Sequence, residues 1–345
     1  MQNVRKASIY IFIVLLAGCV DRVDLKLGGQ DNLLVVDGLI TDQPGPYTVT
    51  LSRSLKYDNS GIATTYLVPE KKAQVSILVQ NGGTTSKFPL SETSSGVYEI
   101  NSMSFKGVVG NTYSIEIHTT DGKVYRSNPE LMLATPEVDE IIPSLKVTQK
   151  LSVTTGALQD VYAFDISIVT RDPAEEVNYY RWKSHGIIEF FAFTDNASST
   201  CYVSRSPLET QVVVSDDHLM NGNQFNKVVG IAPYERVTRF RAYVEQYSLT
   251  REAFEFWDRI RAQQESTGSI FDPAPAQIRG NVYNIEDNDE TVLGYFGASS
   301  MRENAITFNR AKAANFRYPP NLIPSQYGDC LLQEFGATRI VPEGF

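Results

Sequence analysis

The chain contains 345 residues, and its 31 lysine and arginine residues against 40 aspartate and glutamate residues give a formal net charge of −9. This acidic balance argues against a nucleic-acid partner and against a basic patch for anionic lipid. The length suggests two domains, with one large domain as the alternative, and the 18 tyrosines and 17 phenylalanines favour strands over helices.

Residues 1–18 have the layout of a secretory signal peptide. Arg5 and Lys6 supply the positive start, and an apolar run follows from Ile9 to Ala17. A single transmembrane anchor is the alternative interpretation. The apolar run is only about half of the ~20 residues that span a bilayer, so the sequence favours the signal peptide.

The signal segment ends in Leu16–Cys19, which resembles a bacterial lipobox. This resemblance implies cleavage before Cys19, lipidation of the Cys19 thiol and folding of the remaining chain outside the cytoplasm. Residues 19–31 have no strong periodicity and are expected to form the lipidated tether. Asp21 and Asp24 are similar to the acidic export signal of some Bacteroidota lipoproteins. That similarity favours the cell surface over the periplasmic face of the outer membrane.

Residues 32–136 are predicted to form an immunoglobulin-like β-sandwich. Short segments such as Tyr47–Leu51 alternate between apolar and polar residues, and Asp121–Gly122 is a hairpin turn signal between two of them. Strands at this spacing are typical of a sandwich of about 100 residues. Gly96–Ile100 and Gly110–Ile117 also resemble immunoglobulin-like and prealbumin-like modules of bacterial surface proteins, and we expect their tyrosines to be core or corner residues.

Residues 137–345 are expected to form a larger β-rich domain. Pro136 and Pro143 flank a short segment that we take as the domain boundary. Tyr162–Thr170 alternates with the period of a half-buried strand, and Phe240–Tyr247 continues a series of such strands. The sequence therefore predicts a mainly β fold in both halves.

One helix is predicted within the second domain, over residues 250–266. Thr250 is a good N-cap, and Glu252 lies in the first turn, where the helix dipole favours an acidic residue. The apolar positions repeat at helical spacing and include Phe254 and Trp257. We expect this aromatic face to pack in the core rather than to hold a cofactor.

The cysteines indicate a disulfide. With Cys19 consumed by the lipid, Cys201 and Cys330 remain as an even pair in an oxidising compartment. A bond between them would close a loop of about 130 residues, which the chain-entropy model values at roughly 4–5 kcal/mol. The alternative is two free, buried thiols.

No catalytic or metal-binding motif is found in the sequence, so neither an enzyme nor a cofactor is expected. The histidines are scattered and none has metal-ligand spacing to a cysteine: they are His118, His185 and His218. The acidic run Glu286–Glu290 could bind calcium, but it lacks the glycine of an EF-hand loop and a solvated turn is favoured. Nothing places a second carboxylate opposite Glu175–Glu176 or Asp216–Asp217.

A family resemblance covers nearly the whole chain after the signal segment. Its most specific part is the pattern Phe-Asp-Pro-x-Pro-x-x-Ile-x-Gly-Asn from Phe271, followed by Val292–Phe296. Three other stretches fit the same family, together with the cysteine pair: Val35–Gly38, Gln246–Thr250 and Phe256–Trp257. The pattern resembles DUF4249, a family of Bacteroidota lipoproteins typically encoded beside SusC-like TonB-dependent receptors. The family supplies no catalytic residues.

The resemblance implies a non-catalytic outer-membrane lipoprotein that helps a SusC-like TonB-dependent transporter to capture or retain a nutrient. A structural or assembly subunit with no small ligand is the first alternative. A glycan-binding surface module is the second, although it needs exposed aromatic platforms and the chain has only 2 tryptophans. A hydrolase is the least favoured, because the motifs for it are missing.

Overall fold

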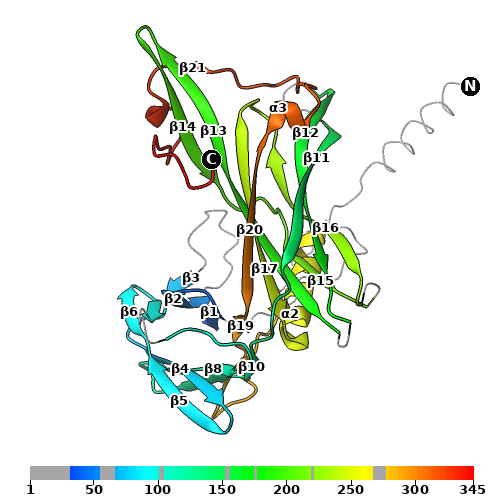
Figure 1. Ribbon diagram of the computed structural model, residues 1–345. Helices are drawn as coiled ribbons and strands as arrows, with labels where there is room; N and C mark the ends of the chain where they lie inside the picture. Colours follow the sequence, from blue (N-terminus) through cyan, green and yellow to red (C-terminus); the bar gives the residue numbers. More distant parts are fainter. Residues whose placement is uncertain are drawn as a thin grey trace, which may run out of the picture.

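A computed structural model describes residues 32–54, 67–100, 105–151, 156–174, 177–218, 221–266 and 277–345. These residues form a mainly β structure, as the sequence predicted. Figure 1 shows an N-terminal unit of short strands and a second unit of long strands that rise from it. The predicted signal peptide, Cys19 and the tether lie outside the described residues. No helix within the described part of the chain is long and apolar enough to cross a membrane.

The short strands of the N-terminal unit form two sheets. Sheet A contains, in spatial order, β19 (Leu293–Ser299), β1 (Leu34–Thr41), β2 (Tyr47–Ser54), β7 (Val97–Ile100) and β6 (Ser91–Ser94), and β3 (Leu67–Pro69) pairs with β2. Sheet B contains β18 (Val282–Asn284), β9 (Val124–Ser127), β8 (Thr112–His118), β4 (Gln74–Asn81) and β5 (Thr84–Pro89), and β10 (Glu130–Leu131) pairs with β8.

One hydrophobic core lies between these sheets, because every second side chain of their strands points inward. Tyr98 and Tyr113 are almost fully buried in it, as the sequence predicted for them. Each hydroxyl group still has a partner: the Tyr98 hydroxyl donates to the Glu70 carbonyl at 2.9 Å, and the Tyr113 hydroxyl accepts from the Val108 amide at 2.7 Å. Both rings therefore fill the core without an unsatisfied polar atom.

Two strands from late in the chain complete the N-terminal unit. β18 pairs with β9 of sheet B, and β19 pairs in parallel with β1 of sheet A. A glycine makes the second pairing possible: Gly294 has φ +82°, and a Cβ there would lie 2.0 Å from the Val36 carbonyl oxygen. Residues 282–299 follow the expected boundary near Pro136 in the sequence, yet they contribute a strand to each N-terminal sheet.

The long strands of the second unit also form two sheets. Sheet C contains β11 (Val138–Leu151), β12 (Leu158–Arg171) and β16 (Gln224–Pro233). Sheet D contains β14 (Ala197–Arg205), β13 (Tyr179–Thr194), β17 (Arg239–Leu249) and β20 (Met301–Asn309), and β15 (Val213–Asp216) and β21 (Gln326–Tyr327) also pair with β13. Both sheets supply a shared core that includes Trp182, whose indole nitrogen donates to Gln246 Oε1 at 2.8 Å.

The predicted helix is present as α2 (Arg251–Glu265). Thr250 caps it as expected, since its hydroxyl oxygen accepts a hydrogen bond from the Ala253 amide at 3.2 Å. Its buried residues, Ala253 and Phe256, pack with Tyr295 of β19 in a small separate core. Trp257 is only partly buried. Two short helical segments follow β20: α3 (Arg310–Ala313) and η1 (Cys330–Leu332).

A disulfide joins Cys201 of β14 to Cys330 of η1, with the two Cα atoms 6.1 Å apart. Both residues are fully buried. The tail is fixed a second time where the Tyr202 amide donates to the Thr338 carbonyl at 2.8 Å. Figure 1 shows this C-terminal segment lying along β14 and β13. The pair expected from the sequence therefore holds the end of the chain against sheet D.

Removing this bond should destabilise the protein strongly, because it cross-links residues separated by 129 positions. We expect the double variant Cys201→Ala/Cys330→Ala to lose about 2–5 kcal/mol of unfolding free energy in urea titrations, as is typical for native disulfides. Non-reducing peptide mass spectrometry should yield one cross-linked peptide from the wild type. Two thiols that react with alkylating agent before any reduction would contradict the assignment.

Candidate functional site

A cavity of about 130 Å³ lies where the two units meet. β1 and β19 of the N-terminal unit form one side of it, and β13, β17 and α2 form the other. Figure 1 shows α2 and the ends of the long strands beside β19. Ligand sites are common at such junctions between domains. We call this cavity, defined by Asp37, Arg181, Lys183, Tyr247 and Trp257, the junction cleft.

Two cations from β13 project into the junction cleft. Side chains of β13 alternate between the core and the opposite face, and Arg181 and Lys183 occupy consecutive positions on that opposite face. The Arg181 guanidinium carbon lies 3.4 Å from the centroid of the Trp257 ring, and Lys183 Nζ lies 5.7 Å from the centroid of Tyr247. Neither side chain has a hydrogen bond or an ion pair with the described residues.

Removal from water makes the charged forms of both groups less favourable. Burial lowers the pKa of Arg181 to about 10. Burial also lowers the pKa of Lys183, with a further contribution from the neighbouring Arg181 charge. The carboxylates of Asp37, Glu209 and Glu245 favour both charges from beyond ion-pair distance, but neither cation has a direct ion pair to offset its desolvation.

Asp37 is the acidic residue among those that line the cleft. It lies on β1, is exposed, and is further than ion-pair distance from both cations. Asp37, its two following residues and Lys183 also line a neighbouring groove of about 350 Å³ that continues along β2. The cleft and this groove share these four residues and therefore form a connected recess.

A buried carboxyl group supports the inner wall of the cleft. Glu130 of β10 accepts hydrogen bonds from the Thr250 hydroxyl at 2.7 Å, from Asn281 Nδ2 at 3.2 Å and from the Tyr295 hydroxyl. These donors belong to the cap of α2, the segment before β18, and β19. Burial raises the pKa of Glu130, although its three donors oppose this effect. The same carboxyl group therefore joins both units directly beneath Tyr295.

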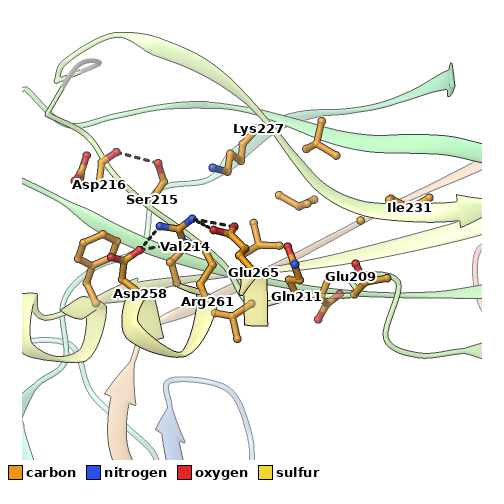
Figure 2. A pocket seen from close by; sticks show the side chains of 17 residues that line it. Glu209, Gln211, Val214, Ser215, Asp216, Lys227, Ile231, Asp258, Arg261 and Glu265 are labelled. Atoms are coloured by element: carbon orange, nitrogen blue, oxygen red, sulfur yellow. Dashed lines mark hydrogen bonds and ion pairs between the residues drawn. The ribbon is translucent and has the colours of Figure 1, made fainter. Parts of the chain in front are cut away.

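A larger pocket of about 540 Å³ lies between β15, β16 and α2. Figure 2 shows Arg261 held between Asp258 and Glu265, with N–O distances of 2.6 and 3.0 Å. Lys227 projects from β16 across the pocket and has no ion pair with the described residues. Arg261 is already paired with two carboxylates of its own helix. This pocket therefore needs an anionic ligand less than the junction cleft does.

The acidic residues singled out in the sequence do not assemble into one site. Glu290, the last residue of the run Glu286–Glu290, forms an ion pair with Lys123 Nζ at 2.9 Å and accepts a hydrogen bond from the Tyr125 hydroxyl at 2.8 Å. Asp217 is buried and accepts from the Asn178 amide at 2.9 Å, whereas Glu175–Glu176 lie outside the described residues. Among the described residues, no group of three or more histidine, cysteine or acidic side chains could hold a metal ion.

Sequence reasoning missed Arg181 and Lys183. The alternation Tyr179–His185 does mark a polar and aromatic face on β13. It does not show that β1, β19 and α2 cover this face, because those contacts come from segments far away in the sequence. Trp257 was expected in the core, but it lies at the edge of the core and stacks on Arg181.

A family model described as a domain of unknown function, DUF4249, matches residues 20–305. The chain belongs to the DUF4249 family. No curated protein matches this sequence. In this DUF4249 protein, the described stretches that carry the family pattern converge on the junction cleft and contribute lining residues to it: Asp37, Tyr247, Trp257 and Tyr295. The Phe271–Ala276 part of the pattern lies outside the described residues.

Glu130 should make the stability of the junction depend on pH. Since its pKa is raised in the folded state, its stabilising contribution is complete below the unfolded pKa and is lost as the pH rises through the folded pKa. Glu130→Gln keeps an oxygen that accepts from Tyr295 and Asn281 but cannot ionise. We expect the variant to gain unfolding free energy relative to the wild type as the pH increases above about 4.5.

Urea titrations over a pH series measure this difference. Glu252→Gln is the matched comparison, because Glu252 is exposed in the first turn of α2 and its charge contributes to raising the pKa of Glu130. This variant should keep the direction of the wild-type pH dependence but reduce its size. If the unfolding free energies of Glu130→Gln and the wild type differ by the same amount at every pH, the pKa of Glu130 is not raised in the folded state and the prediction is wrong.

Proposed function

We propose that this DUF4249 protein is a non-catalytic lipoprotein of the outer membrane, anchored through Cys19, that binds a nutrient in the junction cleft as an accessory subunit of a SusC-like TonB-dependent transporter. The observation that carries the binding role is the pair of cations that line a cavity between the two units and have no hydrogen bond or ion pair with the described residues. The lipobox, the acidic β-rich chain and the family resemblance support the anchoring and the partner.

The chemistry of the cleft supports binding better than catalysis. Its described lining residues include Asp37 but no histidine or cysteine, and Asp37 has no second carboxylate opposite it in the lining. General acid–base catalysis needs a donor and an acceptor of protons that both reach the reacting atoms. An arginine stacked on tryptophan beside a lysine is instead suited to hold a charged group in a fixed orientation.

A structural or assembly subunit remains the second candidate, and one observation favours it. Large apolar side chains are exposed near the C-terminal segment and the adjacent hairpin: Phe193, Tyr327, Leu332, Phe335 and Ile340. Leu332 is 88% exposed and Ile340 is 78% exposed, and exposed apolar side chains that gather in a patch are a feature of protein contact surfaces. This candidate predicts a stable protein complex and no small ligand.

A glycan-binding module is less well supported. Such modules stack sugar rings on exposed aromatic platforms, but Trp182 is buried in the core and Arg181 covers one face of Trp257. Neither tryptophan therefore offers a fully exposed ring to a sugar.

Purification from native outer membranes tests the proposal. A tagged wild-type protein should label with a fatty-acid analogue, fractionate with the outer membrane and recover a SusC-like barrel. Cys19→Ala should abolish labelling and reduce recovery of the barrel at least about tenfold, because membrane anchoring depends on the acyl chains. Cys201→Ala is the matched control and should label normally.

Recovery of the lipoprotein without any barrel would overturn the transport role. Fatty-acid labelling that persists in Cys19→Ala would overturn the anchoring site.

A further inference from the structure

We propose that Arg181 and Lys183 form a carboxylate-binding site at the inner end of the junction cleft, so that the ligand is a small organic anion with one carboxylate group and an apolar body. This inference rests on the proposed role of the cleft as the nutrient-binding site, and it names the chemical class of the ligand.

The first argument is the missing counter-ion. Two other buried arginines in the described structure have acceptors: Arg310 donates to the Pro233 carbonyl and to Thr238, and Arg53 pairs with Glu70 at 2.6 Å. Arg181 and Lys183 contact only aromatic faces, and the carboxylates of Asp37, Glu209 and Glu245 act on them without forming an ion pair. Buried charges are normally paired directly, so two such cations that line a cavity indicate that an anionic ligand can supply the direct partner.

The second argument is the geometry of Arg181. Because Trp257 lies 3.4 Å from the guanidinium carbon, one face of the guanidinium is covered by the indole. Its N–H groups lie in the guanidinium plane and stay available at the edge. A planar fork of donors matches the two oxygens of a carboxylate in a bidentate contact. Lys183, two residues along the same strand, adds a second positive charge on the same side.

The third argument is the balance of charge and polarity. Arg181 and Lys183 are the cations of the lining and Asp37 is its acidic residue, while Glu209 and Glu245 act on both cations from outside the lining. The remaining wall is largely apolar: Leu39, Leu249, Ala253, Trp257 and Ala298. A cavity of about 130 Å³ accommodates a small group, and the neighbouring groove of about 350 Å³ can receive the rest of a longer ligand.

Calorimetric titration of the full-length protein in detergent tests the inference with benzoate, neutral benzamide and inorganic phosphate as probes. Benzoate should bind roughly 10- to 100-fold more tightly than benzamide, as expected for charge-assisted hydrogen bonds to a desolvated arginine. Phosphate should bind more weakly than benzoate, because it is not planar and leaves the apolar wall uncovered. Equal affinity for benzoate and benzamide, or a preference for phosphate, would overturn the carboxylate assignment.

Three variants locate the contact. Arg181→Gln and Lys183→Gln should each weaken benzoate binding at least about tenfold and leave benzamide unaffected. Arg181→Lys keeps the charge but removes the planar fork, and it should restore only part of the affinity. The matched control is Lys227→Gln in the larger pocket, which also removes a half-buried lysine without an ion pair and should bind benzoate as the wild type does.

The Lys183 variant keeps the test decisive if Arg181→Gln fails to fold, since Lys183 makes no hydrogen bond with the described residues. Benzoate binding that is unchanged in both glutamine variants would overturn the inference. Its failure is distinct from failure of the transport role: a protein that recovers the barrel but does not discriminate benzoate refutes only the ligand class. A protein that binds benzoate through Arg181 but recovers no barrel refutes only the partner.

Discussion

The parallel pairing of β19 with β1 is the contact on which the rest of the structure depends. It joins residues about 258 positions apart in the sequence, from Val35 opposite Leu293 to Thr41 opposite Ser299. Gly294 permits it, because any side chain at that position would collide with the Val36 carbonyl. Closing such a long loop is entropically unfavourable, and the two hydrophobic cores on either side of the strand must offset the cost. The two units are consequently joined by a shared strand and not by a simple linker.

This shared strand also creates the junction cleft. β19 carries Tyr295 against α2 on one side and runs beside β1 on the other, so it brings Asp37 of β1 towards the half-buried face of β13. Glu130 fixes the same region by accepting hydrogen bonds from Thr250, Asn281 and Tyr295, which belong to three separate segments. Together, β1, β19 and α2 cover this face of β13 and exclude water from its side chains. The desolvation of Arg181 and Lys183 therefore follows directly from the way in which the units are joined.

Local patterns in the sequence were sufficient to predict the secondary structure of individual segments. The cap at Thr250 and the apolar spacing located α2 to within about one residue at each end, and strict alternation located strands such as β8 and β12. The sequence pattern from Phe271 onward was also sufficient to predict the DUF4249 family. The cleft could not be predicted, because alternation identifies the outward face that carries Arg181 without identifying what lies over it. Val292–Phe296 falls within the predicted second domain, and nothing in its residues specifies a parallel partner in the first.

A ligand in the junction cleft would bind both units at once, and this couples binding to the stability of the junction. Any molecule that binds only the folded state increases the free energy of unfolding by an amount that grows with its concentration relative to its dissociation constant. In this protein the same molecule would also neutralise the two cations whose burial the junction imposes. The unliganded junction thus carries an electrostatic cost that the hydrophobic cores and the Glu130 network offset. A ligand of the proposed class would lower this cost on binding and so strengthen the contact between the two units.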